Sequence, residues 1–343
     1  MMIPRMHHRY GRRALVLVAA CALASACSTS GPPATPLIDV PAGFPQPHFP
    51  DDNALTSDRI ALGKKLFYDK QLSRTGEVAC GSCHLQENAF ADPRPLSIGV
   101  NGQLGKRNAP SLANMVYNTS YFWDGGVPTL EQQAIQPIIN PLEMNMTLGE
   151  VVSRVAADPA YVDMFRRAYN SEPRPEFVTK AIASFVRTLV SGHSRYDRYE
   201  QGDTTALTAS ELRGMNIFFG EKAECFHCHI GFNFTNNGYR NNGIYATYVD
   251  KGRELITEDP ADEGKFKVPT LRNIALTAPY MHDGSFETLD AVVNHYTSGG
   301  QKNPNTDAVI RPFTLTAQER TDLIAFLGSL TDEQFITDTK FRK

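Results

Sequence analysis

The sequence of 343 residues has few cysteines, no apolar run long enough for a membrane helix and no excess of basic residues. It has one tryptophan, and only four of its six cysteines lie beyond residue 27. Its apolar run, residues 14–26, is too short to span a bilayer. It also has no excess of basic residues, because the formal net charge is −3. This balance disfavours nucleic acid as a partner.

The N-terminus has the pattern of an export signal. Four arginines, Arg5, Arg9, Arg12 and Arg13, precede the apolar run, so we expect residues 1–26 to be removed and the protein to be periplasmic. Removal would leave 30 basic and 37 acidic side chains, a charge of −7. The end of the run fits a small-residue cleavage site, and it also fits a lipoprotein signal in which Cys27 would carry a lipid, the only expected link to the membrane.

The four remaining cysteines occur in two C-x-x-C-H motifs, Cys80-Gly-Ser-Cys83-His84 and Cys225-Phe-His-Cys228-His229. In such a motif the two thiols add to the vinyl groups of a haem, and the adjacent histidine ligates its iron. A zinc site would need a second C-x-x-C or a histidine pair, and the sequence offers neither. The motifs therefore predict two covalently bound haem c groups.

Segments 159 residues apart match in residue type and spacing, which indicates an internal duplication. The run at residues 110–114 matches residues 269–273, and Trp123-Asp-Gly matches His282-Asp-Gly. We therefore predict two cytochrome c-like haem domains, residues 51–203 and 204–343. Residues 27–50 contain seven prolines from position 32 onward and are expected to form an extended, unpacked tether.

The readable secondary structure is helical, so the predicted fold class is mostly α with long loops. Thr56 or Ser57 can cap a helix that continues to Phe67, and residues 208–219 repeat this pattern. Residues 177–190 and 316–330 have helical apolar spacing. The stretches 92–111 and 232–268 are rich in glycine, asparagine and proline and predict long loops, where site residues often lie.

The duplication also suggests how the two haems differ. Tyr296 stands where the first domain has Pro137. A tyrosine oxygen can ligate ferric iron and a proline cannot, so we expect the first haem to be open to a small oxidant and the second to be closed by Tyr296. Tyr296 could instead be a packed aromatic, with His295 or Met281 as the ligand.

The chain resembles the bacterial di-haem cytochrome c peroxidases and their MauG-like relatives from about residue 50 to 331. The resemblance rests on five motifs that occur in order: Arg107-Asn-Ala-Pro110, Phe122-Trp-Asp-Gly125, Leu130-Glu-Gln-Gln133, Glu143-Met144 and Leu276-Thr-Ala-Pro-Tyr280.

This resemblance implies roles for individual residues. Trp123 would relay electrons between the haems, although a single tryptophan can also be ordinary core. Gln133 and Glu143 would lie in the peroxide pocket of the open haem, unless they belong to a solvated helix face. The resemblance also implies a calcium site formed by Asn108 and the backbone carbonyls of Thr277 and Pro279, since calcium prefers oxygen donors.

Two departures from the peroxidase pattern favour the MauG- or MbnH-like branch. Val100 follows Ser97-Ile-Gly99, where the peroxidases have a histidine that blocks the first haem, and Tyr296 replaces a methionine. The resemblance then implies an enzyme that uses hydrogen peroxide to oxidise an aromatic residue of a partner protein by long-range electron transfer. The alternatives are a cytochrome c peroxidase supplied with electrons by a small redox protein, and a non-enzymatic electron carrier.

Overall fold

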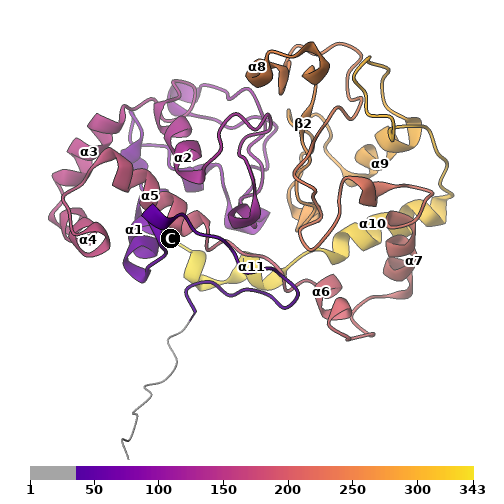
Figure 1. Ribbon diagram of the computed structural model, residues 1–343, viewed down its shortest axis with the longest axis horizontal. Helices are drawn as coiled ribbons and strands as arrows, with labels where there is room; N and C mark the ends of the chain where they lie inside the picture. Colours follow the sequence, from indigo (N-terminus) through magenta and orange to yellow (C-terminus); the bar gives the residue numbers. More distant parts are fainter. Residues whose placement is uncertain (1–35) are drawn as a thin grey trace, which may run out of the picture. The chain divides into compact units, whose positions relative to one another are not determined.

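The structure, a computed structural model, describes residues 36–343, so the predicted export signal and Cys27 lie outside the described residues. Helices dominate this part, in agreement with the predicted fold class (Figure 1). The α-helices are α1 (Ser57–Phe67), α2 (Leu130–Ile139), α3 (Leu148–Ala156), α4 (Pro159–Tyr169), α5 (Pro175–Val186), α6 (Arg195–Glu200), α7 (Ala209–Phe218), α8 (Glu254–Thr257), α9 (Leu289–Ser298), α10 (Ala317–Ser329) and α11 (Glu333–Thr337). Within the described range, none of the helices combines the length and apolarity that a membrane crossing needs.

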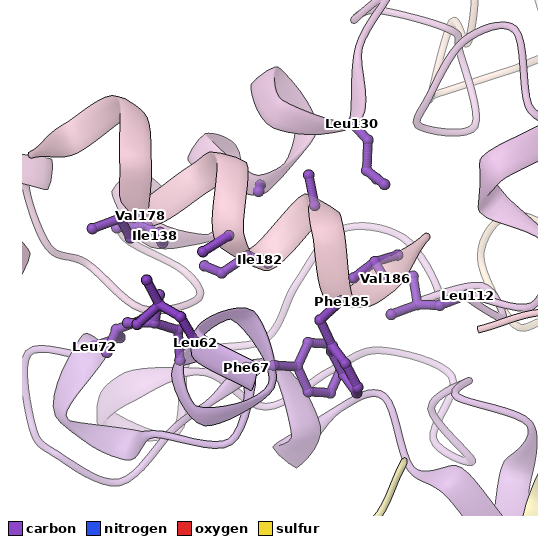
Figure 2. Packing of buried hydrophobic residues seen from close by; sticks show 14 of the residues in the cluster. Leu62, Phe67, Leu72, Leu112, Leu130, Ile138, Val178, Ile182, Phe185 and Val186 are labelled. Atoms are coloured by element: carbon purple, nitrogen blue, oxygen red, sulfur yellow. The ribbon is translucent and has the colours of Figure 1, made fainter. Parts of the chain in front are cut away.

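The N-terminal half is organised around α1 and α5, which pack against each other. Thr56 caps α1 by accepting a hydrogen bond from the backbone of Arg59. Figure 2 shows Leu62 and Phe67 of α1 next to Phe185 of α5 in a cluster of fully buried side chains. Helix α5 ends at Val186, four residues before its predicted end. The next residue, Arg187, pairs with Glu131 of α2.

The C-terminal half has a similar helix pair, α7 and α10. Thr208 caps α7 through a capping box with Glu211, as the sequence predicts for a helix that starts here. Phe218 of α7 and Phe326 of α10 lie 5.2 Å apart between ring centroids, and Phe234 packs against both. Burial of these rings holds the helices beside the second C-x-x-C-H motif.

Glycines allow the close approach of both helix pairs. A β-carbon on Gly63 of α1 would lie 1.8 Å from the carbonyl oxygen of Ala181, and one on Gly214 of α7 would lie 1.9 Å from that of Asp322. Backbone atoms cannot move aside as a flexible side chain can. The two glycines are therefore required by packing.

We expect Gly214→Ala to destabilise the protein by about 1–3 kcal/mol or more, because the added methyl group forces α7 away from α10. Thermal unfolding followed by circular dichroism would measure the loss. Gly328→Ala is the matched control, since Gly328 lies in α10 with open space around it. Equal unfolding temperatures for the two variants would contradict this account.

The two halves meet at a buried polar cluster. Asn114 and Asn273, which the sequence comparison places at matching positions, both have left-handed backbone conformations, with φ of 62° and 60°. Asn114 donates to the carbonyl oxygen of Ser191 at 2.9 Å, and Asn273 donates to the Ser191 hydroxyl at 2.9 Å. One carboxylate oxygen of Asp332 also accepts from Ser191, at 3.1 Å. Ser191 therefore links both halves through bonds shielded from water.

The prediction of an unpacked tether is wrong for residues 37–50. Leu37–Lys343 form one compact unit, and Pro41 is buried. The Phe44 ring lies 4.7 Å from that of Phe232, and the Arg272 guanidinium lies 4.6 Å from the Phe44 ring centre. Prolines keep this segment extended, but the buried side chains of Ile38 and Pro41 and the ring contacts of Phe44 attach it to the core.

The C-terminal segment also departs from the predicted domain boundary. Phe335 of α11 and Phe341 belong to the buried cluster of the N-terminal half, and both rings pack against Phe90. Figure 1 shows α11 in yellow close to α1 and α5, in agreement with these contacts. Residues 333–341 therefore complete the core around the first C-x-x-C-H motif, although the sequence assigns them to the second domain.

The predicted loop 232–268 contains short regular elements. Strands β1 (Tyr239–Arg240) and β2 (Phe266–Lys267) pair antiparallel, with Tyr239 opposite Lys267. The loop also contains α8. The backbone nitrogen of Lys267 donates to the carbonyl oxygen of Trp123, which attaches β2 to the N-terminal half.

Candidate functional site

The first C-x-x-C-H motif begins with a 3-10 helix, Cys80–Ser82, which places both cysteines and His84 on one tight turn. The Nδ1 atom of His84 lies 2.8 Å from the carbonyl oxygen of Phe90, so Nδ1 must carry the proton. Burial lowers the pKa of His84, which keeps the imidazole neutral. Such an anchored ring presents Nε2 as a metal ligand.

The second motif has the same local geometry. A 3-10 helix covers Cys225–His227, and Nδ1 of His229 lies 3.0 Å from the carbonyl oxygen of Phe234. Burial lowers the pKa of His229 as well. Cys225, Cys228 and His229 all line one cavity of about 300 Å³. Two thiols, a neutral imidazole and an apolar cavity fit a covalently attached haem.

Two of the three candidates for the sixth ligand of the second haem line this cavity. Tyr296, on α9, and Met281 both contribute to its wall. His295 is not part of the wall, and its Nε2 lies 3.0 Å from the carbonyl oxygen of Asn242. The position of His295 argues against it as the ligand.

Asn242 contacts the two remaining candidates. Its amide nitrogen lies 3.3 Å from the sulfur of Met281. Burial raises the pKa of Tyr296 to about 12, and a hydrogen bond with Asn242 opposes part of that rise. Tyr296 is therefore a neutral phenol in the protein alone. A bound ferric iron would supply the positive charge that a phenolate needs.

Glu143 lies close to the first motif. The carboxylate accepts a hydrogen bond of 2.6 Å from Asn140, and its charge contributes to the raised pKa of the Cys80 and Cys83 thiols. Burial raises the pKa of Glu143 above its ordinary value. A half-buried carboxyl group with a raised pKa suits proton transfer in a peroxide pocket.

Val100 packs against the backbone that carries Glu143. Its nitrogen donates to the Glu143 carbonyl oxygen at 2.8 Å, and its side chain is only 1% exposed. Gly99 lies against the same turn, because a β-carbon there would be 2.0 Å from the Leu142 carbonyl oxygen. Gln133, on α2, is half-buried, and its side chain forms no hydrogen bond among the described residues. Among the described residues, no hydrogen bond joins Gln133 to Glu143, whose carboxylate accepts from Asn140.

Trp123 lies between the halves. Its indole nitrogen donates to the Asn108 carbonyl oxygen at 2.9 Å, and its side chain packs against the buried cluster of Ile244, Tyr248 and Phe266 in the C-terminal half. It also lines the cavity of the second motif. Trp123 is therefore partly core, and it is also in position to act as a relay.

The predicted calcium ligands lie around the same cavity, since Asn108, Thr277 and Pro279 all line it. The Asn108 amide nitrogen donates to the carbonyl oxygen of Arg94 at 2.9 Å. This bond leaves the amide oxygen of Asn108 available to a cation. This amide oxygen and the backbone carbonyl oxygens of Thr277 and Pro279 are the kind of ligand that calcium prefers.

Two residues of the site were missed in the sequence. Lys267 lines the cavity without a carboxylate partner among the described residues, and its ammonium group donates to the Ser120 carbonyl oxygen at 3.0 Å. Burial lowers the pKa of Lys267 to about 8. Asn242 was the second omission. Neither residue lies in a motif, because their roles arise from a strand pairing and a loop contact between distant segments.

Comparison with known proteins identifies relatives over most of the chain. A family profile described as di-haem cytochrome c peroxidase matches residues 57–205. The methylamine utilization protein MauG of Methylorubrum extorquens is 40% identical over 290 residues, 84% of this chain and 82% of that protein. Cytochrome-c peroxidase IdrP1 of Pseudomonas sp. (strain SCT) is 35% identical, covering 95% of this chain and 94% of that protein. A solved MauG-like protein associated with microbial copper homeostasis has a TM-score of 0.85 at 39% identity, covering 88% of this chain and 97% of that one.

A helical fold with two C-x-x-C-H sites is the architecture of a di-haem oxidoreductase. The chain belongs to the di-haem cytochrome c peroxidase and MauG family. Members of this family are oxidoreductases that use peroxide, and membership implies two haem c groups. Relatives named MauG and relatives named cytochrome c peroxidase both occur, so membership alone does not choose between their reactions.

Proposed function

We propose that this protein uses hydrogen peroxide to oxidise an aromatic residue of a partner protein by long-range electron transfer, as a MauG-like enzyme. The observation that carries the proposal is the position of Tyr296, which lines the same cavity as the histidine of the second motif, while the His295 ring contacts the backbone of Asn242. An anionic tyrosine ligand stabilises ferric iron and so lowers the reduction potential of the haem. The second haem would then accept electrons from a reduced cytochrome poorly.

In this proposal each residue has a separate task. The two C-x-x-C-H motifs would hold the haems, which would supply the redox chemistry with peroxide. Glu143 moves the peroxide proton, and Gln133 orients the peroxide. Trp123 carries electrons between the halves. Asn108, with the carbonyls of Thr277 and Pro279, binds a calcium ion that holds the two halves together around Trp123.

We also propose that the two haem domains arose by duplication. The 3-10 helices of the two motifs, the histidine anchors and the helices α2 and α9 correspond in pairs, and each of these two α-helices has ten residues. The sequence pattern of residues 1–26 supports export to the periplasm, and the residues before Cys27 also fit a lipoprotein signal.

A cytochrome c peroxidase is the second candidate, and one observation favours it. Met281 lines the same cavity as Tyr296, and its sulfur is a suitable haem ligand. With methionine bound, the second haem could accept electrons from a small redox protein. The two functions therefore differ in which of these side chains ligates the iron.

The resting oxidised enzyme is expected to react with peroxide without prior reduction, because Val100 occupies the place of a blocking histidine. Stopped-flow absorbance of the haem would follow this reaction. Val100→His is the informative variant, since it should make the resting enzyme inert until it is half-reduced. Wild-type enzyme that is inert when oxidised, or that rapidly turns over reduced cytochrome c, would favour the peroxidase.

A further inference from the structure

Aromatic side chains continue from Trp123 to the surface of the C-terminal half. Trp123 packs against the buried cluster that contains Phe266 and Tyr248. The Phe266 ring stacks on His282, with ring centroids 3.7 Å apart and planes 15° apart. Tyr245 follows, with its ring 5.7 Å from Tyr248 and 6.4 Å from His282 between centroids. Ring contacts connect four of these side chains, Phe266, His282, Tyr248 and Tyr245, and Trp123 packs against the buried cluster that contains two of them.

Tyr245 is the member of this path that a partner can touch. Its side chain is 36% exposed, whereas Tyr248, Phe266 and His282 are buried. Phe266 and His282 also line the cavity of the second motif. Tyr245 is therefore one aromatic contact away from the cavity and also in contact with solvent.

The phenol of Tyr245 has a partner that can accept its proton. It donates to the Asp283 carboxylate at 2.5 Å. In the described part of the chain only one other phenol donates to a carboxylate, Tyr161 to Asp69 at 2.6 Å. The phenol of Tyr248 donates to an amide oxygen, which is not a base. An oxidised phenol is a strong acid, so a neighbouring carboxylate makes its oxidation easier.

The Tyr245 pair has the protonation state that this step needs. Burial acts to raise the pKa of Asp283, but hydrogen bonds from Tyr245 and Ser285 hold it below its ordinary value. Burial and the bond to Asp283 raise the pKa of Tyr245. At neutral pH the pair is therefore a protonated phenol beside an ionised carboxylate.

We propose that Tyr245 is the redox-active surface residue through which the partner protein is oxidised. This inference rests on the proposed function. Tyr245 gives one electron to the aromatic path toward Trp123 and its phenolic proton to Asp283, leaving a neutral tyrosyl radical and a protonated carboxyl group. The partner's aromatic residue then returns one electron to Tyr245 and releases one proton to solvent, and Asp283 returns its proton to the Tyr245 phenol. Two such cycles remove two electrons and two protons from the partner, which balances the two electrons and two protons that reduce one hydrogen peroxide to two water molecules.

The test is freeze-quench electron paramagnetic resonance of the di-haem enzyme mixed with hydrogen peroxide, with no partner and no reductant. A tyrosyl radical signal is expected, and ring-deuterated tyrosine should narrow it. Tyr245→Phe should remove the signal. Asp283→Asn should lower its yield, because the amide cannot accept the proton. Tyr161→Phe is the matched control and should keep the signal, since Tyr161 also donates to a carboxylate but has no ring contact with the path among residues 36–343.

The intensity of the tyrosyl radical signal is divided by the concentration of oxidised enzyme. The optical spectrum of the same samples gives that concentration. An equal signal in Tyr245→Phe and the wild type would overturn the assignment of Tyr245, and so would oxidised wild-type enzyme with no tyrosyl radical. If peroxide produces no oxidised enzyme at all, the proposed function itself is wrong, and the role of Tyr245 falls with it. The optical and magnetic measurements therefore separate the two failures.

Discussion

Replacement of Glu143 by glutamine is expected to slow the reaction with hydrogen peroxide by about a hundredfold or more, the effect typical of a lost general acid-base group. Glutamine has nearly the same shape and can still interact with Asn140, so the pocket should remain intact. Stopped-flow measurement of the oxidised enzyme at several peroxide concentrations would give the rate constant.

The pH dependence of the rate of the peroxide reaction provides a second test of the role of Glu143. Burial raises the pKa of Glu143 above its ordinary value of 4.5. The carboxylate that accepts the peroxide proton is therefore present above this raised pKa and is lost as the pH falls through it. The wild-type rate should fall on the acid side, and Glu143→Gln should lose this dependence.

Glu87→Gln is the control for Glu143→Gln. Glu87 lies near the first motif, is exposed and forms no side-chain hydrogen bond among the described residues. Its replacement should leave the rate unchanged. An unchanged rate in Glu143→Gln as well would exclude that carboxylate from proton transfer to or from the peroxide.

Replacement of Tyr296 by methionine is expected to abolish oxidation of the partner protein while peroxide is still consumed. A neutral sulfur donates less charge to oxidised iron than a phenolate does, so the second haem could no longer share the oxidising equivalents. Tyr296→His should have the same effect. Optical and magnetic spectra of the resting wild type should show one high-spin and one low-spin haem.

Met281→Leu is the matched variant, because Met281 lines the same cavity. If Tyr296 is the ligand, this variant should keep the low-spin haem and the oxidation of the partner. A sulfur-to-iron charge-transfer band in the wild type that disappears in Met281→Leu would instead assign the ligand to Met281. That result would reject MauG-like chemistry and favour the cytochrome c peroxidase.

Local patterns were sufficient to predict much of the fold. Thr56 and Thr208 cap α1 and α7 as expected, because capping depends on residues only three positions apart. Helix α10 begins and ends within one residue of its prediction for the same reason. The end of α5 was less accurate, since the helix ends at Val186 although the apolar spacing continues to residue 190.

The sequence by itself determined the chemistry of haem attachment, since two cysteines and a histidine in five consecutive residues can bind a haem wherever the chain carries them. It also determined the family, through motifs of consecutive residues. Only the tertiary structure decided which side chains face the second cavity. Tyr296 lines that cavity and its neighbour His295 does not, because adjacent residues of a helix point in different directions. It also decided the packing of Phe44 and Phe335 and the pairing of Tyr245 with Asp283, because these contacts join residues that are far apart in the chain.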